Sequence, residues 1–200
     1  MRVLTVVGNR PQFVKAAAVS RLLRERAEEV LVHTGQHHDD ALSRIFFQEL
    51  GLAHPDIELG VSGASNTSQL ARMLGALEPL LGEVRPDAAL VYGDTNSTLA
   101  GALCAAQAGV RVVHVEAGMR SFDRAMPEEQ NRVLSDHLAD LLLCPSEVAA
   151  ENLRREAVAG RVEVVGDVMV DVALRWQARA RAEDSAPAAH GLQTLSLIHI

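Results

Sequence analysis

Cysteine, lysine and long apolar runs are scarce in this 200-residue chain. With only Cys104 and Cys144, a disulfide scaffold is excluded, and both residues are expected to be buried free thiols in a reducing compartment. No apolar run approaches the roughly 18 residues that cross a bilayer, and residues 1–8 are too short an apolar segment for a signal peptide. The net charge of −7 disfavours a sequence-independent nucleic-acid binder. These absences predict a cytoplasmic protein with no membrane and no nucleic-acid partner.

Lysine is the rarest of the charged residues. The 19 basic residues are 18 arginines and Lys15. Because a flat guanidinium fork cannot replace a compact ammonium at every site, a lone lysine suggests a specific contact. A chance survivor on a helix surface is an equally good explanation from composition alone. The remaining composition, 48% hydrophobic and 22% charged, fits one or two globular domains.

Short apolar runs alternate with segments of helical periodicity along most of the chain. Strands are expected over residues 2–8, 30–34, 88–92, 110–115, 140–144 and 162–165. Helices are expected over residues 12–26, 39–50, 66–84, 95–108, 128–138 and 146–156, with a last helix ending near residue 183. Residues 53–65 are expected to form a loop. This alternation predicts an α/β fold with a doubly wound, Rossmann-like parallel sheet, whose ligands bind at the carboxyl ends of the strands.

The first strand ends in Gly8-Asn9-Arg10-Pro11, and a helix follows. The segment lacks the G-x-G-x-x-G pattern of a dinucleotide site. Arg10 at a helix N-terminus, with Lys15 about one turn further on, would form an anion site together with the helix dipole. A plain turn with proline at the start of the helix explains the same residues equally well.

Three carboxylates follow later strands. Asp94 is expected to cap the helix beginning near Thr95, which is the commoner role, and it can face the crevice at the strand ends as well, since the two roles do not exclude each other. Glu116 ends an otherwise apolar strand, where period-2 alternation puts it on the same face as His114, and we favour a functional role for it. Glu128 opens a helix, where an acidic residue suits the dipole without any chemistry. If all three reach one crevice with Arg10 and Lys15, they can divide acid and base roles on a phosphorylated or nucleotide-linked sugar.

Several of these motifs resemble one family, the non-hydrolysing UDP-N-acetylglucosamine 2-epimerases. The resemblance extends from residue 2 to about residue 180. The motifs that carry it are Gly8-Asn-Arg-Pro-Gln12, Gly93-Asp-Thr-Asn-Ser-Thr98, His114-Val-Glu-Ala-Gly118, Arg120-Ser-Phe-Asp123, Met126-Pro-Glu-Glu-Gln-Asn-Arg132 and Val165-Gly166.

The resemblance implies a fold and a reaction. The fold would be the N-terminal domain of a two-domain GT-B-type protein. The reaction would interconvert UDP-GlcNAc and UDP-ManNAc, supplying ManNAc units for surface polysaccharide, with no metal or other cofactor and usually as a homodimer. Asp94, Glu116 and Glu128 would be the acid/base and positioning carboxylates, and Arg10 and Lys15 the substrate and phosphate contacts. The motifs do not settle which carboxylate moves which proton.

Two departures from the family accompany the resemblance. Asn9 and Gln12 stand where the family usually has threonine and glutamate. The chain also lacks the family's C-terminal, UDP-binding domain. We therefore expect one domain over residues 1–182, and a linker with a non-native tail over residues 183–200. The tail's last residues, 195–200, look like a translated sequencing adapter, which suggests a truncated gene.

Other functions remain open. A hydrolysing UDP-GlcNAc 2-epimerase or a GT-B glycosyltransferase would use a similar domain. A module that binds a nucleotide sugar without catalysis is a further alternative.

Overall fold

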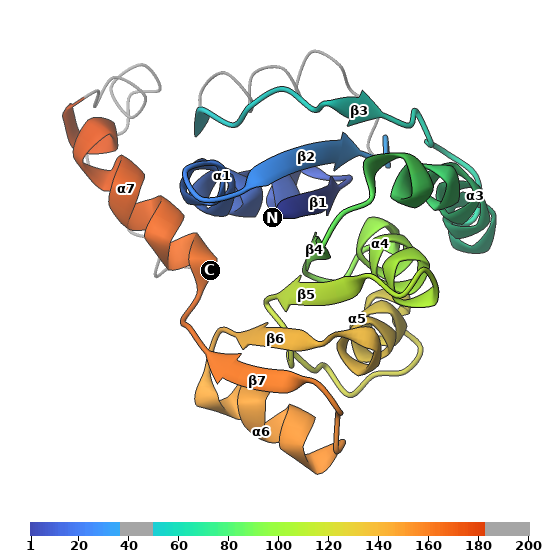
Figure 1. The fold of residues 1–200 in the computed structure, drawn as a ribbon. Helices are drawn as coiled ribbons and strands as arrows, with labels where there is room; N and C mark the ends of the chain where they lie inside the picture. Colours follow the sequence, from blue (N-terminus) through green and yellow to red (C-terminus); the bar gives the residue numbers. More distant parts are fainter. Residues whose placement is uncertain (37–49, 183–200) are drawn as a thin grey trace.

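The computed structural model describes residues 1–36 and 50–182, and these form one parallel sheet covered by helices on both faces (Figure 1). The seven strands, in the order β3-β2-β1-β4-β5-β6-β7, are β1 (Arg2–Val7), β2 (Glu28–His33), β3 (Ile57–Glu58), β4 (Ala88–Tyr92), β5 (Arg111–Val115), β6 (Leu141–Cys144) and β7 (Arg161–Val164). The helices are α1 (Arg10–Arg24), α3 (Asn66–Val84), α4 (Asn96–Gln107), α5 (Pro127–Leu138), α6 (Glu147–Arg155) and α7 (Val168–Ala182). All strand pairs are parallel, so the predicted doubly wound sheet is confirmed.

Alternating strand residues build two cores, one on each side of the sheet. On one side, Phe13 and Ala17 of α1 pack with Val7 of β1 and with Val168 at the start of α7. On the other side, residues of α3, α4 and α6 pack against Leu4, Val6 and the inner residues of β4 to β6. Strand order reverses between β1 and β4, whose ends therefore flank the crevice where such folds bind ligands.

The helix and strand boundaries agree with the sequence-based expectation except at one edge of the sheet. Residues 53–65 were expected to be a loop, but Ile57 and Glu58 form β3 beside Val32 and His33 of β2. Two residues at a sheet edge carry no alternation by which a sequence pattern could reveal them. The helix expected over residues 39–50 lies almost entirely outside the described residues.

The two cysteines are buried and unpaired, as expected from their number. Burial raises the pKa of both the Cys104 and Cys144 thiols to about 11. Because only the thiolate is a good nucleophile, we expect the folded chain to react with a thiol reagent at pH 8 at least about tenfold more slowly than in denaturant. Reaction of either cysteine at its denatured rate would contradict this burial.

Candidate functional site

The turn after β1 lies directly against the start of α4. A β-carbon on Gly8 would stand 1.9 Å from Oγ of Ser97 and 2.4 Å from Oγ1 of Thr34. No side chain fits there, so glycine is required by close approach. Ser97 also donates to Oε1 of Gln36, through its backbone N–H (3.2 Å) and its hydroxyl (2.7 Å).

Gln12 joins the turn after β1 to the turn after β4. Its buried Oε1 accepts a hydrogen bond from the Gly8 N–H at 2.7 Å, and Nε2 donates to the carbonyl of Tyr92 at 2.7 Å and to Oγ1 of Thr98 at 2.9 Å. A carboxylate could accept from Gly8 but has no hydrogen for the Tyr92 carbonyl. The amide is therefore matched to its partners in this chain, where the resemblance leads one to expect glutamate.

Arg10 and Lys15 lie at the N-terminal end of α1, which Asn9 caps by accepting from the Gln12 N–H at 3.1 Å. Arg10 is exposed at the first helical residue. The Lys15 side chain is only 12% exposed and forms an ion pair with Glu116. The lone lysine therefore has a specific partner at the crevice rather than a place on a solvated helix face.

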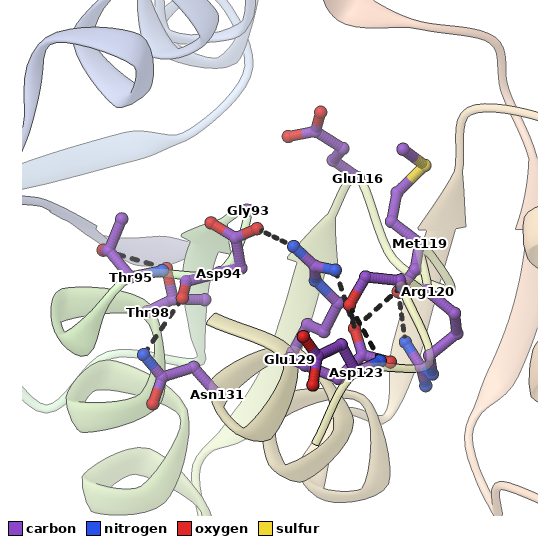
Figure 2. Close-up of polar contacts among 12 residues, drawn as sticks. Gly93, Asp94, Thr95, Thr98, Glu116, Met119, Arg120, Asp123, Glu129 and Asn131 are labelled. Carbon is purple, nitrogen blue, oxygen red and sulfur yellow. Dashed lines mark hydrogen bonds and ion pairs between the residues drawn. The ribbon is translucent and has the colours of Figure 1, made fainter. Parts of the chain in front are cut away.

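Asp94 does not cap α4, so that expectation is wrong. Thr95 is the N-cap and shares a capping box with Thr98. The carboxylate of Asp94 instead pairs with Nη2 of Arg132 at 2.5 Å, and its backbone carbonyl accepts from Nδ2 of Asn131 at 3.0 Å (Figure 2). These contacts hold Asp94 toward α5 and leave its carboxylate at the strand ends.

Glu116 follows the last residue of β5 with φ +71°, a left-handed conformation that is costly for a residue with a β-carbon. Its N–H donates to the Leu143 carbonyl at 3.0 Å, which fixes the turn. The expectation that Glu116 and His114 share a face is wrong, because the turn breaks the strand alternation. Glu116 pairs with Lys15 of α1, whereas His114 bonds to Asp136 of α5.

Asp94 and Glu116 line one small cavity. It measures about 50 Å³, and its lining residues are Gly93, Asp94, Glu116, Met119 and Arg132. Figure 2 shows Asp94 and Glu116 on neighbouring turns, with Met119 beside Glu116. Each carboxylate at this cavity is paired with a cation: Glu116 pairs with Lys15, and Asp94 pairs with Arg132. A polyanionic ligand that attracted the cations would release both carboxylates for proton transfer.

Glu128 lies apart from this cavity in the chain as described. It is exposed on the first turn of α5, whereas its neighbour Glu129 is buried. Glu129 accepts from the N–H groups of Ser121 and Phe122 and pairs with Arg132 at 2.7 Å. Burial favours the neutral carboxyl, but these donors outweigh it and hold the pKa of Glu129 below its usual range. The catalytic role of Glu128 stays a prediction.

The sequence reasoning missed Glu129, Arg132 and Asp136. Their spacing of three and four residues puts them on one face of α5, and Glu129 and Asp136 are buried while Leu134 is 51% exposed. This helix therefore buries polar groups and exposes an apolar one. That inverted pattern is the signal that could have found them.

Neither a metal site nor a membrane helix emerges from the described part of the chain. Residues 1–36 and 50–182 contain no group of three or more His, Cys, Asp and Glu side chains placed to hold a metal ion. Within the same ranges, no helix combines the length and apolar character needed to cross a bilayer.

The fold and the charged cavity define an α/β domain of the class that forms the N-terminal half of GT-B-like epimerases. A family model described as UDP-N-acetylglucosamine 2-epimerase matches residues 21–198. The chain belongs to this family.

Its relatives are about twice as long. A UDP-N-acetylglucosamine 2-epimerase homolog of Methanococcus maripaludis is 48% identical over 86% of this chain and 48% of its own length. A UDP-2,3-diacetamido-2,3-dideoxy-D-glucuronate 2-epimerase of Pseudomonas aeruginosa is 47% identical over 90% of this chain and 52% of its own length. The chain thus spans about half of the curated relatives it matches.

Solved structures agree. The Methanocaldococcus jannaschii UDP-GlcNAc 2-epimerase, in complex with UDP-GlcNAc and UDP, superposes with a TM-score of 0.90 at 39% identity, over 94% of this chain and 52% of that one. UGT2 of Phytolacca americana shares the fold alone, with a TM-score of 0.55 at 12% identity.

Proposed function

We propose that this chain is the N-terminal half of an enzyme that inverts C2 of a UDP-linked 2-acetamido sugar, interconverting UDP-GlcNAc and UDP-ManNAc. The observation that carries the proposal is the cavity that unites Asp94 and Glu116 between two cations. Membership of the epimerase family supports it.

The reaction requires a proton to leave C2 and another to arrive from the opposite face. In the first half, a carboxylate takes the C2 proton, the C1–O bond breaks with its electron pair leaving on UDP, and a C1=C2 double bond remains. In the second half, a proton is added to the other face of C2 and UDP re-forms the bond to C1. Two carboxylates from different strands suit this demand, because each can serve one face of the sugar.

The cations have a matching task. A diphosphate entering the crevice would compete for Lys15 and Arg132, each now paired with a carboxylate. Binding of the leaving group would then free Glu116 and Asp94 as bases, while the cations stabilise the charge on departing UDP. Arg10, exposed at the start of α1, lies where a helix N-terminus favours a further phosphate contact.

A second substrate class has a specific observation in its favour. The relative named as a UDP-2,3-diacetamido-2,3-dideoxy-D-glucuronate 2-epimerase is 47% identical, above the 42% of the Methanococcus maripaludis UDP-GlcNAc 2-epimerase. The same C2 chemistry would serve both sugars, so the test must offer both.

The test uses a completed chain, in which residues 1–182 are joined to the second half of the Methanocaldococcus jannaschii relative. Each UDP-sugar is incubated with the completed chain, and its 2-epimer is followed by NMR, with the second half alone as the control. UDP-ManNAc from UDP-GlcNAc is the expected product. Release of free ManNAc would instead indicate a hydrolysing epimerase, transfer of sugar to an acceptor a glycosyltransferase, and binding without turnover a non-catalytic module. Light scattering on the same sample tests the homodimer that the resemblance implies.

Lys15 offers a further prediction for the completed chain. Lys15→Arg keeps the charge but puts a wider, planar group into the space beside Glu116 and Gly93. We expect kcat/KM to fall by about tenfold or more, because the fork cannot take the position of the ammonium. The matched control is Arg21→Lys, which makes the reverse exchange at an exposed residue of α1. Equal kcat/KM for Lys15→Arg and the parent would show that the lone lysine has no specific role.

A further inference from the structure

A largely buried chain of charged groups connects β5 and α5 beneath the site, and only its last member, Glu156, is partly exposed. His114 and Asp136 are both 0% exposed, and Nδ1 of His114 lies 2.7 Å from Oδ1 of Asp136. Oδ2 of Asp136 accepts from Nη1 of Arg120 at 2.7 Å. Arg120 also makes a two-point contact with Glu156, at 2.8 and 2.6 Å. None of these groups lines the small cavity.

Hydrogen-bond geometry fixes the proton count of the His114 ring. Nε2 lies 2.7 Å from the carbonyl oxygen of Gly93, which can only accept, so this nitrogen carries a hydrogen. Independently of His114, Oδ2 of Asp136 accepts from the Arg120 guanidinium at 2.7 Å and from the Gly118 N–H at 3.1 Å, and both contacts favour the ionised carboxylate. An ionised carboxylate also only accepts, so Nδ1 carries a hydrogen as well. A ring that donates from both nitrogens is an imidazolium, so this hydrogen-bond pattern places two cations, His114 and Arg120, against Asp136 and the partly exposed Glu156.

Two adjacent members of this chain, His114 and Asp136, contact the two turns that carry the candidate carboxylates. Through His114, it reaches the carbonyl of Gly93, the residue before Asp94. Through Oδ2 of Asp136, it accepts the N–H of Gly118 at 3.1 Å, two residues after Glu116. Both glycines have positive φ and lie in turns, and the Gly93 N–H also donates to the Val115 carbonyl at 3.0 Å. Asp136 thus adds a buried side-chain link between the two turns to the direct backbone bond from Gly93 to Val115.

We propose that His114, as an imidazolium paired with Asp136, is a positioning residue that fixes the turn bearing Asp94 relative to the turn bearing Glu116. The expected effect on kcat rests on the proposed function, but the protonation of His114 and the hydrogen bonds to the two turns do not. The informative variant is Asp136→Asn, which keeps the shape and removes the charge. Neutral His114 can still bond to both partners with one hydrogen, but without charge assistance these bonds are weaker, so the variant loosens the turns without opening a cavity. The matched control is Asp140→Asn, since Asp140 also accepts a backbone N–H, that of Val112 at 2.8 Å, but at the other end of β5.

The first measurement needs only the 200-residue chain. Nitrogen-15 NMR at neutral pH, with the His114 signals assigned by their loss in His114→Gln, should show hydrogen on both ring nitrogens. Asp136→Asn should convert the ring to the neutral form, and it should speed amide exchange at Gly93 and Asp94, which Asp136 reaches only through His114. Asp140→Asn should do neither. A neutral ring in the parent chain would overturn the proposal, and no variant is needed to see it.

The second measurement uses the completed chain. Asp136→Asn should lower kcat by about tenfold or more, because the carboxylates lose their spacing, while KM changes by less than about twofold. Asp140→Asn should change neither constant. An unchanged kcat in Asp136→Asn would overturn the positioning role even if the ring is charged. If the completed parent is inactive, the proposed function fails, and the exchange rates at Gly93 and Asp94 still decide whether the turns are coupled.

Discussion

Asp94→Asn and Glu116→Gln should each lower the kcat of the completed chain by about 100-fold or more, as expected when an acid or base is removed. Each exchange keeps the shape of the side chain and removes its charge from the 50 Å³ cavity that both residues line. Neither change opens a void in the two cores. The losses should therefore appear in turnover, measured by NMR with UDP-GlcNAc, and not in the amount of folded protein.

Controls separate chemistry from stability. Glu78→Gln, at an exposed carboxylate of α3, should leave turnover unchanged. Melting curves should show Asp94→Asn folded. Glu116→Gln should lose a little stability, because it leaves the mostly buried Lys15 without a charged partner. Turnover near the parent level in both variants would remove these carboxylates from the mechanism.

Glu128 is tested beside its neighbour. Because Glu128 is exposed and Glu129 is buried with several donors, Glu128→Gln should leave the melting temperature unchanged, whereas Glu129→Gln should lower it. If Glu128 takes part in the reaction, its variant loses turnover without losing stability. Full turnover would mean that the glutamate only complements the helix dipole.

Periodicity predicted the sheet because its strands are covered on both faces and read as unbroken apolar runs. Strand ends then placed Asp94 and Glu116 together, since the carboxyl ends of parallel strands share one edge. The strand β3 could not be predicted, because two residues are too few to show an alternating pattern. The side chain of Asp94 was harder to place, because aspartate before a helix is a common cap and nothing local reveals that Thr95 takes that role here.

The side chains that surround the candidate carboxylates could not be predicted from the sequence pattern near each residue. Glu128 and Glu129 are adjacent on a helix and so point about 100° apart, and only the packing of α5 decides which is buried. The partners Lys15–Glu116 and Arg132–Asp94 are 101 and 38 residues apart in the chain. Glu116 turns away from the face of His114 through a left-handed residue, which strand alternation does not anticipate. Sequence patterns therefore do not predict which side chains of different helices and strands pair with one another.

The 200-residue chain alone should show no epimerase activity with UDP-GlcNAc, whereas the completed chain turns over. The relatives are about twice as long, and under the proposed function this chain supplies the wall that bears the carboxylates while the second half supplies the wall opposite. Alignment of reactants inside a closed, water-excluding site is worth effective molarities of about 10⁵ M or more, and a single wall cannot supply it. We also expect weak binding of the nucleotide, with a Kd in the millimolar range or above, which corresponds to no more than about 4 kcal/mol.

NMR tests this with the chain, the second half and the completed chain side by side. The chain's own spectrum shows whether it is folded in each sample, so inactivity cannot be mistaken for loss of structure. Mixing the two separate halves is the informative addition. If the carboxylate wall needs only its opposite wall, the mixture should recover part of the activity, rising with concentration as the halves associate. Turnover by the chain alone within tenfold of the completed chain would place the whole reaction on residues 1–182, and the UDP contacts would then have to be sought around Arg10 and Lys15.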